Sequence, residues 1–287
     1  MTAPGVTVDV VTRLAASLGR TVVFAIALLA AGTGAAQARQ LADKPLVYTA
    51  RKEKMTAGNL KVDLVLVTPV APKPQPVLIV FASGDGGLTG ISKATLQHLA
   101  DQGYYVAGLS SRAALKSIKD ANGRIAHHVA LSSLTSLFEQ ARVALKLPAA
   151  TPLIVTGMSR GANMAVIAAG APDLQRSIAG GVAIALTREA DYLDVPVGAE
   201  KAGIELDAKG RLQMYPAIQR IGAIPFAVIQ STKDSYVPSA ESRQLLGPDT
   251  VIRRLYEVTS GGHNFNGGED VMFRDLDDAL TWITARK

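Results

Sequence analysis

The sequence predicts an α/β fold with a mainly parallel central sheet and helices on both of its faces. Short apolar segments recur from residue 77 to the end of the chain, and continuous runs of this kind are typical of strands buried on both faces. Segments with helical spacing separate them, and such alternation produces βαβ crossovers within a parallel sheet. With 287 residues, 48% of them hydrophobic, the chain is long enough to bury a sizeable core.

The predicted strands are apolar runs bounded by glycine, proline or polar turn residues. The first of them, "NLKVDLVLVT", alternates in part, whereas "VLIVFAS" and "YYVAGLS" are apolar almost throughout. Strands are expected at residues 59–68, 77–83, 104–110, 152–157, 177–186, 224–231 and 251–260. Helices are expected at residues 91–103, 127–147, 160–170, 239–247 and 270–286, where apolar residues recur at helical spacing.

One long segment, 187–223, interrupts this alternation. It lies between two predicted strands and contains many charged and turn residues, as in "TREADYLDVPVGAEKAGIELDAKG". A connection of this length within a compact domain is usually functional. We expect it to cross the top of the sheet as a lid or a specificity insertion.

The N-terminal segment has the order of a secretory signal peptide. Two arginines precede the apolar run at 21–31, and small residues follow it, ending in an Ala-Gln-Ala sequence at Ala38. The apolar run is too short for a stable membrane anchor. We expect cleavage after Ala38, which gives a signal peptide, 1–38, and a mature domain, 39–287; the alternative is a buried helix of the domain. An exported protein without cysteine suits a periplasm.

The composition excludes several classes of site. The absence of cysteine rules out a disulfide framework, a thiolate zinc site and a cysteine nucleophile. The formal net charge is +6, but the basic residues are scattered with few aromatic residues between them, so no nucleic-acid partner is expected. A mildly basic surface either contributes to ordinary solubility or attracts anionic membranes and acidic substrates. We expect neither a metal nor a cofactor.

Ser159 lies between a predicted strand and a predicted helix, in the sequence "TGMSRGA". Gly-x-Ser-x-Gly at a strand-to-helix turn is the pattern of a nucleophile elbow, which holds the serine strained and exposed. Side chains at Gly157 and Gly161 would collide with the neighbouring strand and helix. The turn also puts Ser159 at a helix N-terminus, which favours negative charge. Ser159 is therefore a candidate nucleophile; the alternative is an ordinary serine in a glycine-rich turn.

Two later strand ends supply partners for this serine. Asp234 follows the predicted strand 224–231, and His263 follows 251–260 in the glycine-rich loop "TSGGHNFNGG". The carboxyl ends of parallel strands meet at one edge of the sheet, where sites form. A histidine there can act as a base for the serine, while a carboxylate orients the histidine. The alternatives are a turn aspartate and a solvated loop histidine.

Other residues of these types are placed less favourably. His98 lies within a predicted helix, and His127 and His128 begin another. Asp191 and Asp194 are alternative acids in the insertion. The chain order serine, aspartate, histidine, each after a successive strand, is the order of α/β-hydrolases and differs from the orders of trypsin and subtilisin.

A second glycine-rich loop, "SGDGG", follows the strand 77–83. In the α/β-hydrolase fold this loop supplies one N–H of the oxyanion hole, and the residue after the nucleophile supplies the other. We expect the donors to be the backbone N–H of Arg160 and one between Gly84 and Gly86, that of Asp85. The loop lacks the Gly-Lys-Ser/Thr ending of a phosphate-binding P-loop, which is the alternative reading of its glycines.

Four segments together resemble the VirJ/AcvB group of bacterial virulence-associated hydrolases within the α/β-hydrolase superfamily. They are "SGDGG", "GMSRGA", "ALTREADY" and "GGHNF", in this order. The superfamily resemblance covers residues 45–287. It implies Ser159 as nucleophile, Asp234 as acid and His263 as base, with Asp85 in the oxyanion loop.

The same resemblance implies export to the periplasm and hydrolysis of aminoacylated phosphatidylglycerol, an anionic phospholipid, notably of its lysyl ester. Acidic side chains such as Asp85 or members of 187–209 are then expected to bind the cationic lysyl group. From the residues themselves, we expect a serine esterase that forms an acyl-enzyme. A general carboxylesterase or thioesterase would use the same site with a different pocket. The alternative to an enzyme is a non-catalytic binding module for envelope or secreted proteins.

Overall fold

The computed structural model describes residues 48–70, 75–195 and 204–286. All of them belong to one unit of contacting residues, Pro45–Lys287. The predicted signal peptide, 1–38, lies outside the described residues, and so does part of the predicted insertion. No helix in the described ranges is long and apolar enough to cross a membrane.

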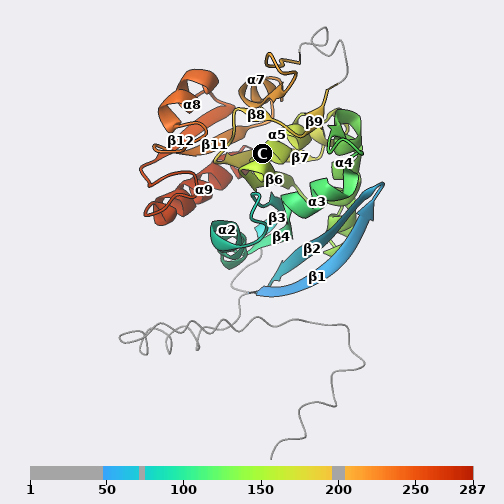
Figure 1. The fold of residues 1–287 in the computed structure, drawn as a ribbon. Helices are drawn as coiled ribbons and strands as arrows, with labels where there is room; N and C mark the ends of the chain where they lie inside the picture. Colours follow the sequence, from blue (N-terminus) through green and yellow to red (C-terminus); the bar gives the residue numbers. More distant parts are fainter. Residues whose placement is uncertain (1–47, 71–74, 196–203, 287) are drawn as a thin grey trace, which may run out of the picture. The chain divides into compact units, whose positions relative to one another are not determined.

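A mainly parallel sheet forms the centre of this unit (Figure 1). Within the described residues it has eight strands, in the order β1-β2-β4-β3-β6-β7-β11-β12. β2 is antiparallel to both of its neighbours, whereas all other neighbouring strands are parallel. The strands are β1 (Tyr48–Ala57), β2 (Leu60–Pro69), β3 (Gln75–Ala82), β4 (Tyr104–Leu109), β6 (Leu153–Met158), β7 (Ile178–Ile184), β11 (Phe226–Ser231) and β12 (Arg253–Val258).

Helices cover both faces of the sheet and close two hydrophobic cores. Along β3 the side chains alternate between them, with Leu78 and Val80 in one core and Ile79 and Phe81 in the other. The first core is covered by α3 (Ser111–Ile118), α4 (His127–Ala144), α5 (Arg160–Ala169), the short α6 (Pro172–Gln175), α7 (Met214–Gln219) and α8 (Ser239–Leu246). The second core is covered by α2 (Gly90–Asp101) and α9 (Glu269–Thr284).

The predicted fold class is confirmed, and each predicted strand and helix is present with ends shifted by a few residues. Of the elements with eight or more residues, two were not predicted. β1 reads "YTARKEKMTA", in which charged residues break the apolar pattern; it pairs along its whole length with β2. α3 has eight residues, too few for a periodic pattern, and is stabilised by Ser110, whose side chain accepts a hydrogen bond from the N–H of Ala113.

The described part of the predicted insertion consists of short regular elements. They are β8 (Glu189–Ala190), β9 (Leu193–Asp194), β10 (Leu212–Gln213) and α7. β8 pairs with β10, and β9 pairs with β5 (Ile125–Ala126), which precedes α4. Arg124 reinforces the second pairing, because its guanidinium donates to the backbone oxygens of Asp191 and Leu193 and to the carboxylate of Asp194. The segment is thereby joined to the body of the domain.

Candidate active site

Ser159 occupies the turn between β6 and α5. Its backbone has φ 54° and ψ −118°, a conformation that residues with side chains rarely adopt. A Cβ added to Gly157 would lie 2.1 Å from the carbonyl oxygen of Gly161, and one added to Gly161 would lie 2.0 Å from that of Ala82 in β3. Because neither position leaves room for a side chain, this turn requires glycine at both.

The structure brings Ser159, His263 and Asp234 together from the ends of β6, β12 and β11. The Oγ of Ser159 lies 2.8 Å from the Nε2 of His263, and the Nδ1 of His263 lies 2.8 Å from the Oδ2 of Asp234. When Nδ1–H donates to the carboxylate, Nε2 is left to accept the hydroxyl hydrogen of the serine. The three side chains thus form a continuous chain of hydrogen bonds.

The carboxylate of Asp234 is fully buried and surrounded by donors. Its Oδ1 accepts hydrogen bonds from the backbone N–H groups of Tyr236 and Val237, at 2.8 and 3.4 Å. Its Oδ2 accepts from His263 and from the Nε2 of Gln230, the latter at 3.0 Å. A buried charge is tolerated when it is bonded in this way, so the fold holds an ionised carboxylate behind the histidine.

Gln230 was not among the residues predicted from the sequence. Its side chain is buried in β11, where its Nε2 also donates to the backbone oxygen of Val237 at 2.6 Å and its Oε1 accepts from the N–H of Leu186 at 3.0 Å. Gln230 therefore joins the turn that carries Asp234 to the end of β7. The signal in the sequence is one amide side chain near the end of the apolar strand "FAVIQS".

His263 is held by a tight loop. The backbone has positive φ at Gly262 and Phe265, and the fully buried ring of Phe265 anchors the loop in the core. The loop is closed by a hydrogen bond from the N–H of Gly261 to the backbone oxygen of Asn266, at 2.7 Å. These contacts fix the direction of the imidazole, whose side chain is 16% exposed.

Among the described residues, the other predicted acids and bases make no contact with the serine. His98 pairs with an aspartate of α9, and His127 and His128 begin α4. Asp194 pairs with an arginine, and Asp191 lines the pocket described next. No group of three or more His, Asp or Glu side chains in the described ranges is arranged to hold a metal ion.

The loop after β3 lies directly against the serine. A Cβ added to Gly84 would lie 3.5 Å from the Cβ of Ser159. The N–H of Gly84 donates to the Oγ of Ser92, whereas the N–H of Asp85 has no hydrogen-bond partner among the described residues. Arg160 is the first residue of α5, so its N–H lies at the positive end of the helix dipole.

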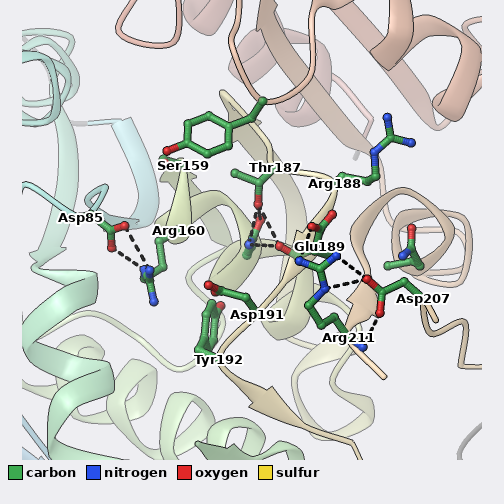
Figure 2. Close-up of a pocket in the computed structure, with 13 residues that line it drawn as sticks. Asp85, Ser159, Arg160, Thr187, Arg188, Glu189, Asp191, Tyr192, Asp207 and Arg211 are labelled. Atoms are coloured by element: carbon green, nitrogen blue, oxygen red, sulfur yellow. Dashed lines mark hydrogen bonds and ion pairs between the residues drawn. The ribbon is translucent and has the colours of Figure 1, made fainter. Parts of the chain in front are cut away.

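A pocket of about 560 Å³ opens beside Ser159. Figure 2 shows Glu189, Asp207 and Arg211 gathered on one side of it. Arg211 binds both carboxylates, at 2.6 Å from Glu189 and 2.5 Å from Asp207. Asp191 differs from them, since its carboxylate has no hydrogen-bond or ion-pair partner within the described part of the chain. The pocket therefore presents one free negative charge near the serine.

Asp85 and Arg160 form an ion pair on the opposite side of this pocket (Figure 2). The Nη2 of Arg160 donates to the Oδ2 of Asp85 at 3.1 Å, and its Nε contacts Oδ1. The guanidinium carbon also lies 5.2 Å from the ring centre of Tyr192, which is buried. Burial alone would lower the pKa of Arg160, but the bond to Asp85 raises it. The negative charge of Asp85 is therefore balanced by the guanidinium of Arg160.

The strand order and the strained serine turn define an α/β-hydrolase fold. Within that fold, the chain belongs to the family of bacterial virulence proteins called VirJ, whose family model matches residues 76–281. The match confirms the family indicated by the four sequence segments, and its span contains Ser159, Asp234 and His263. No curated protein sequence matches the chain.

Solved structures with this fold are similar to the chain over most of its length, at low sequence identity. Est1E from Butyrivibrio proteoclasticus is 12% identical with a TM-score of 0.56, over 82% of this chain and 99% of that chain. The Pyrococcus furiosus esterase Pf2001 is 15% identical with a TM-score of 0.58, over 82% and 91%. An alpha-beta serine hydrolase homologue from Coxiella burnetii is 12% identical with a TM-score of 0.54, over 79% and 97%. These similarities establish the fold.

Proposed function

We propose that this protein is a serine hydrolase that cleaves carboxylic esters. The observation that carries the proposal is the unbroken hydrogen-bonded chain from Ser159 through His263 to Asp234, with both links at 2.8 Å. A nucleophile and a base within hydrogen-bond distance, with the base oriented by a third group, are what acyl transfer through a serine requires. A binding module has no need of this geometry.

The reaction follows from the positions of these atoms. His263 takes the hydroxyl proton of Ser159 as Oγ attacks the ester carbonyl carbon, and the resulting imidazolium is stabilised by the buried carboxylate of Asp234. The tetrahedral intermediate collapses to an acyl-enzyme when His263 gives that proton to the departing alcohol oxygen. Water then attacks the acyl carbon, with the same histidine as base, and releases the carboxylic acid and the free serine.

The backbone N–H groups of Asp85 and Arg160 are the proposed oxyanion donors. The free N–H of Asp85, beside a glycine that touches Ser159, and the N–H of Arg160 at a helix N-terminus support this role. Each such donor typically contributes a factor of about 10² to 10³ to the rate. The ion pair between the two side chains holds both segments in place on either side of the serine.

A fluorophosphonate probe tests the nucleophile. The purified protein is expected to be labelled, and Ser159→Ala is expected to abolish labelling and to reduce ester hydrolysis by about 10⁶-fold. Ser132→Ala, which alters an exposed serine of α4, is the matched control and retains both activities. A folded wild-type protein that is neither labelled nor active on any ester would exclude the hydrolase and favour the binding module.

The free carboxylate of Asp191 supports a substrate with a cationic acyl group. Family membership points to the aminoacylated phosphatidylglycerol associated with the VirJ/AcvB group, whose lysyl ester carries such a group. Export through the predicted signal peptide, 1–38, would bring the enzyme to this lipid in the periplasm. Of the carboxylates that line this pocket, those of Asp85, Glu189 and Asp207 are engaged by arginines, which leaves Asp191.

Hydrolysis of a lysyl ester and of a matched neutral ester by one protein sample tests this substrate. Asp191→Asn is expected to raise KM for the lysyl ester by about tenfold relative to the neutral one. Asp63→Asn, at an exposed position of β2, removes the same charge away from the pocket and leaves that ratio unchanged. Release of acyl groups from neutral esters without release of lysine from lysyl-phosphatidylglycerol would reject the lipid substrate and retain the esterase.

A further inference from the structure

A second pocket adjoins the catalytic one and has the opposite charge. It has a volume of about 390 Å³ and lies along α3. Asp85 and Arg160 line both pockets, so the two cavities meet at this ion pair beside the serine. The rest of the lining is Arg112, Leu115, Lys116 and Lys119.

Two of the three cations lie on α3, and the third lies directly after its last residue. Arg112 and Lys116 are four residues apart, and Lys119, at the C-cap, follows three residues later, so their side chains are neighbours. All three are exposed, and none has a hydrogen-bond or ion-pair partner in the part of the chain that the structure describes. Like charges at this spacing destabilise a helix, and a bound anion would remove that repulsion.

Among the described residues that line it, the pocket has no acidic group free to balance these charges. Its one carboxylate, Asp85, is bound by Arg160, so the remaining charge of the lining is that of Arg112, Lys116 and Lys119. The buried side chain of Leu115 also lines the pocket and adds an apolar surface to it. In the neighbouring pocket the free charge is negative instead. The cationic and the anionic pocket therefore share the ion pair of Asp85 and Arg160, and Ser159 lines the anionic one.

We propose that the pocket along α3 is an anion subsite that binds a phosphate group carried by the ester substrate. Arginine and lysine side chains are the usual partners of phosphate, and three of them around one cavity match the several acceptor oxygens of that group. The inference rests on the proposed ester hydrolysis at Ser159. It adds that Arg112, Lys116 and Lys119 determine specificity by holding the anionic part of the substrate while the carbonyl lies at the serine.

Two esters that differ only in a phosphate test this subsite. They are the butyryl ester of glycerol and the butyryl ester of glycerol 3-phosphate, and the readout is the ratio of their kcat/KM values. Wild type is expected to prefer the phosphate ester by about tenfold or more, with the preference falling as salt is added. The triple variant Arg112→Gln, Lys116→Gln, Lys119→Gln is expected to lose this preference through a higher KM for the phosphate ester.

The matched control removes two lysines and one arginine elsewhere. Lys52, Lys54 and Arg176 are exposed, lie on β1 and at the end of α6, and line neither pocket. Their replacement by glutamine lowers the net charge equally and is expected to retain the wild-type ratio. Equal ratios in wild type and in both variants would overturn the subsite while leaving the hydrolase intact. Absence of hydrolysis of either ester by wild type, together with absence of fluorophosphonate labelling, would instead reject the proposed function.

Binding to vesicles distinguishes a lipid phosphate from a soluble one. The Ser159→Ala protein is mixed with vesicles of phosphatidylcholine containing phosphatidylglycerol, and the bound fraction is measured by sedimentation. If the lipid headgroup occupies the subsite, adding the three α3 substitutions reduces binding several-fold more than adding the control substitutions. If the α3 substitutions and the control substitutions reduce vesicle binding equally but differ in their effect on the kcat/KM ratio of the soluble esters, the phosphate belongs to a soluble substrate. If the two sets of substitutions have equal effects on vesicle binding and equal effects on the kcat/KM ratio, the subsite does not exist.

Discussion

The two sides of Ser159 are built differently. Toward the interior, the hydroxyl, the imidazole, the carboxylate and the amide of Gln230 form one chain of hydrogen bonds that runs from half-buried to buried groups. Toward solvent, the serine faces a rim of charges in which some are paired, as in Arg211 with Glu189, and others are free, as in Asp191. The inner side is suited to one reaction, and the outer side to selecting the molecule that undergoes it.

This difference predicts two kinds of mutational effect. A change on the inner side removes a contact made in the transition state, so it lowers kcat for every ester. A change on the rim alters the binding of a charged substrate, so it acts on KM and depends on the charge of the ester and on salt. Variants of the two sides therefore test whether the division holds.

After the loss of the nucleophile itself, the largest effect is expected at the buried carboxylate. Asp234→Asn replaces the acceptor of the Nδ1–H bond by an amide and favours the wrong tautomer of His263, so kcat should fall by about 10⁴-fold for neutral and charged esters alike. Asp194→Asn is the control, because this other predicted acid pairs with Arg124 outside the site, and it should retain the wild-type kcat. A similar loss in both variants would contradict the role of Asp234.

The next effect concerns the turn that holds the serine. Gly161→Ala places a Cβ 2.0 Å from the backbone oxygen of Ala82, so β3 or α5 must move, and the free energy of unfolding should fall by about 3 kcal/mol or more. Gly170→Ala, at the end of the same helix, meets its neighbours at 3.5 Å with φ −79° and should change stability by less than about 1 kcal/mol. Urea unfolding of the two variants measures both values.

Most of the inner side could be predicted from the sequence, because its geometry depends on residues that are close together in the chain or directly follow strands. A strained serine turn needs glycine two residues away on each side, and this requirement leaves the pattern "GMSRG" in the sequence. That Asp234 and His263 lie beside the serine could be predicted because parallel strands end at one edge, so residues directly after them converge. Gln230 was missed because a single amide in an apolar strand shows its partners only after β7 and β11 are paired.

The rim could not be predicted from the sequence, because pairing between distant charges leaves no local pattern. The expectation that Asp85 would be free to bind a cationic group is weakened by its ion pair with Arg160, 75 residues away. The pocket along α3 depends on a helix too short to be recognised, and its charges look scattered along the chain. The net charge likewise does not reveal that a cationic and an anionic pocket meet at one ion pair.

Gln230 tests how far the inner side extends. Gln230→Leu removes hydrogen bonds to Asp234, Val237 and Leu186, so stability should fall by about 2 kcal/mol and kcat by about tenfold, with KM unchanged. Gln219→Leu is the control for a purely structural loss, since the side chain of Gln219 donates to the backbone oxygen of Leu246, away from the serine. It should lower stability without lowering kcat at a temperature where both variants are folded. A loss of stability alone in Gln230→Leu would limit the residue to a structural role.

The smallest effect is expected on the rim. Unlike the other variants, which lower kcat or stability, this one should improve the binding of a lysyl ester. Arg211→Gln releases the carboxylates of Glu189 and Asp207 beside Asp191, so KM for a lysyl ester should fall about threefold relative to a neutral ester at low salt. The pKa of Asp207 lies below its usual range, first because the N–H of Arg211 donates to it. The backbone donors to Asp207 remain in the variant. The released charge of Asp207 should therefore persist at any pH above the ordinary aspartate range and disappear only in stronger acid. An increase in KM for the lysyl ester would show that Arg211 shapes the pocket rather than masking its charge.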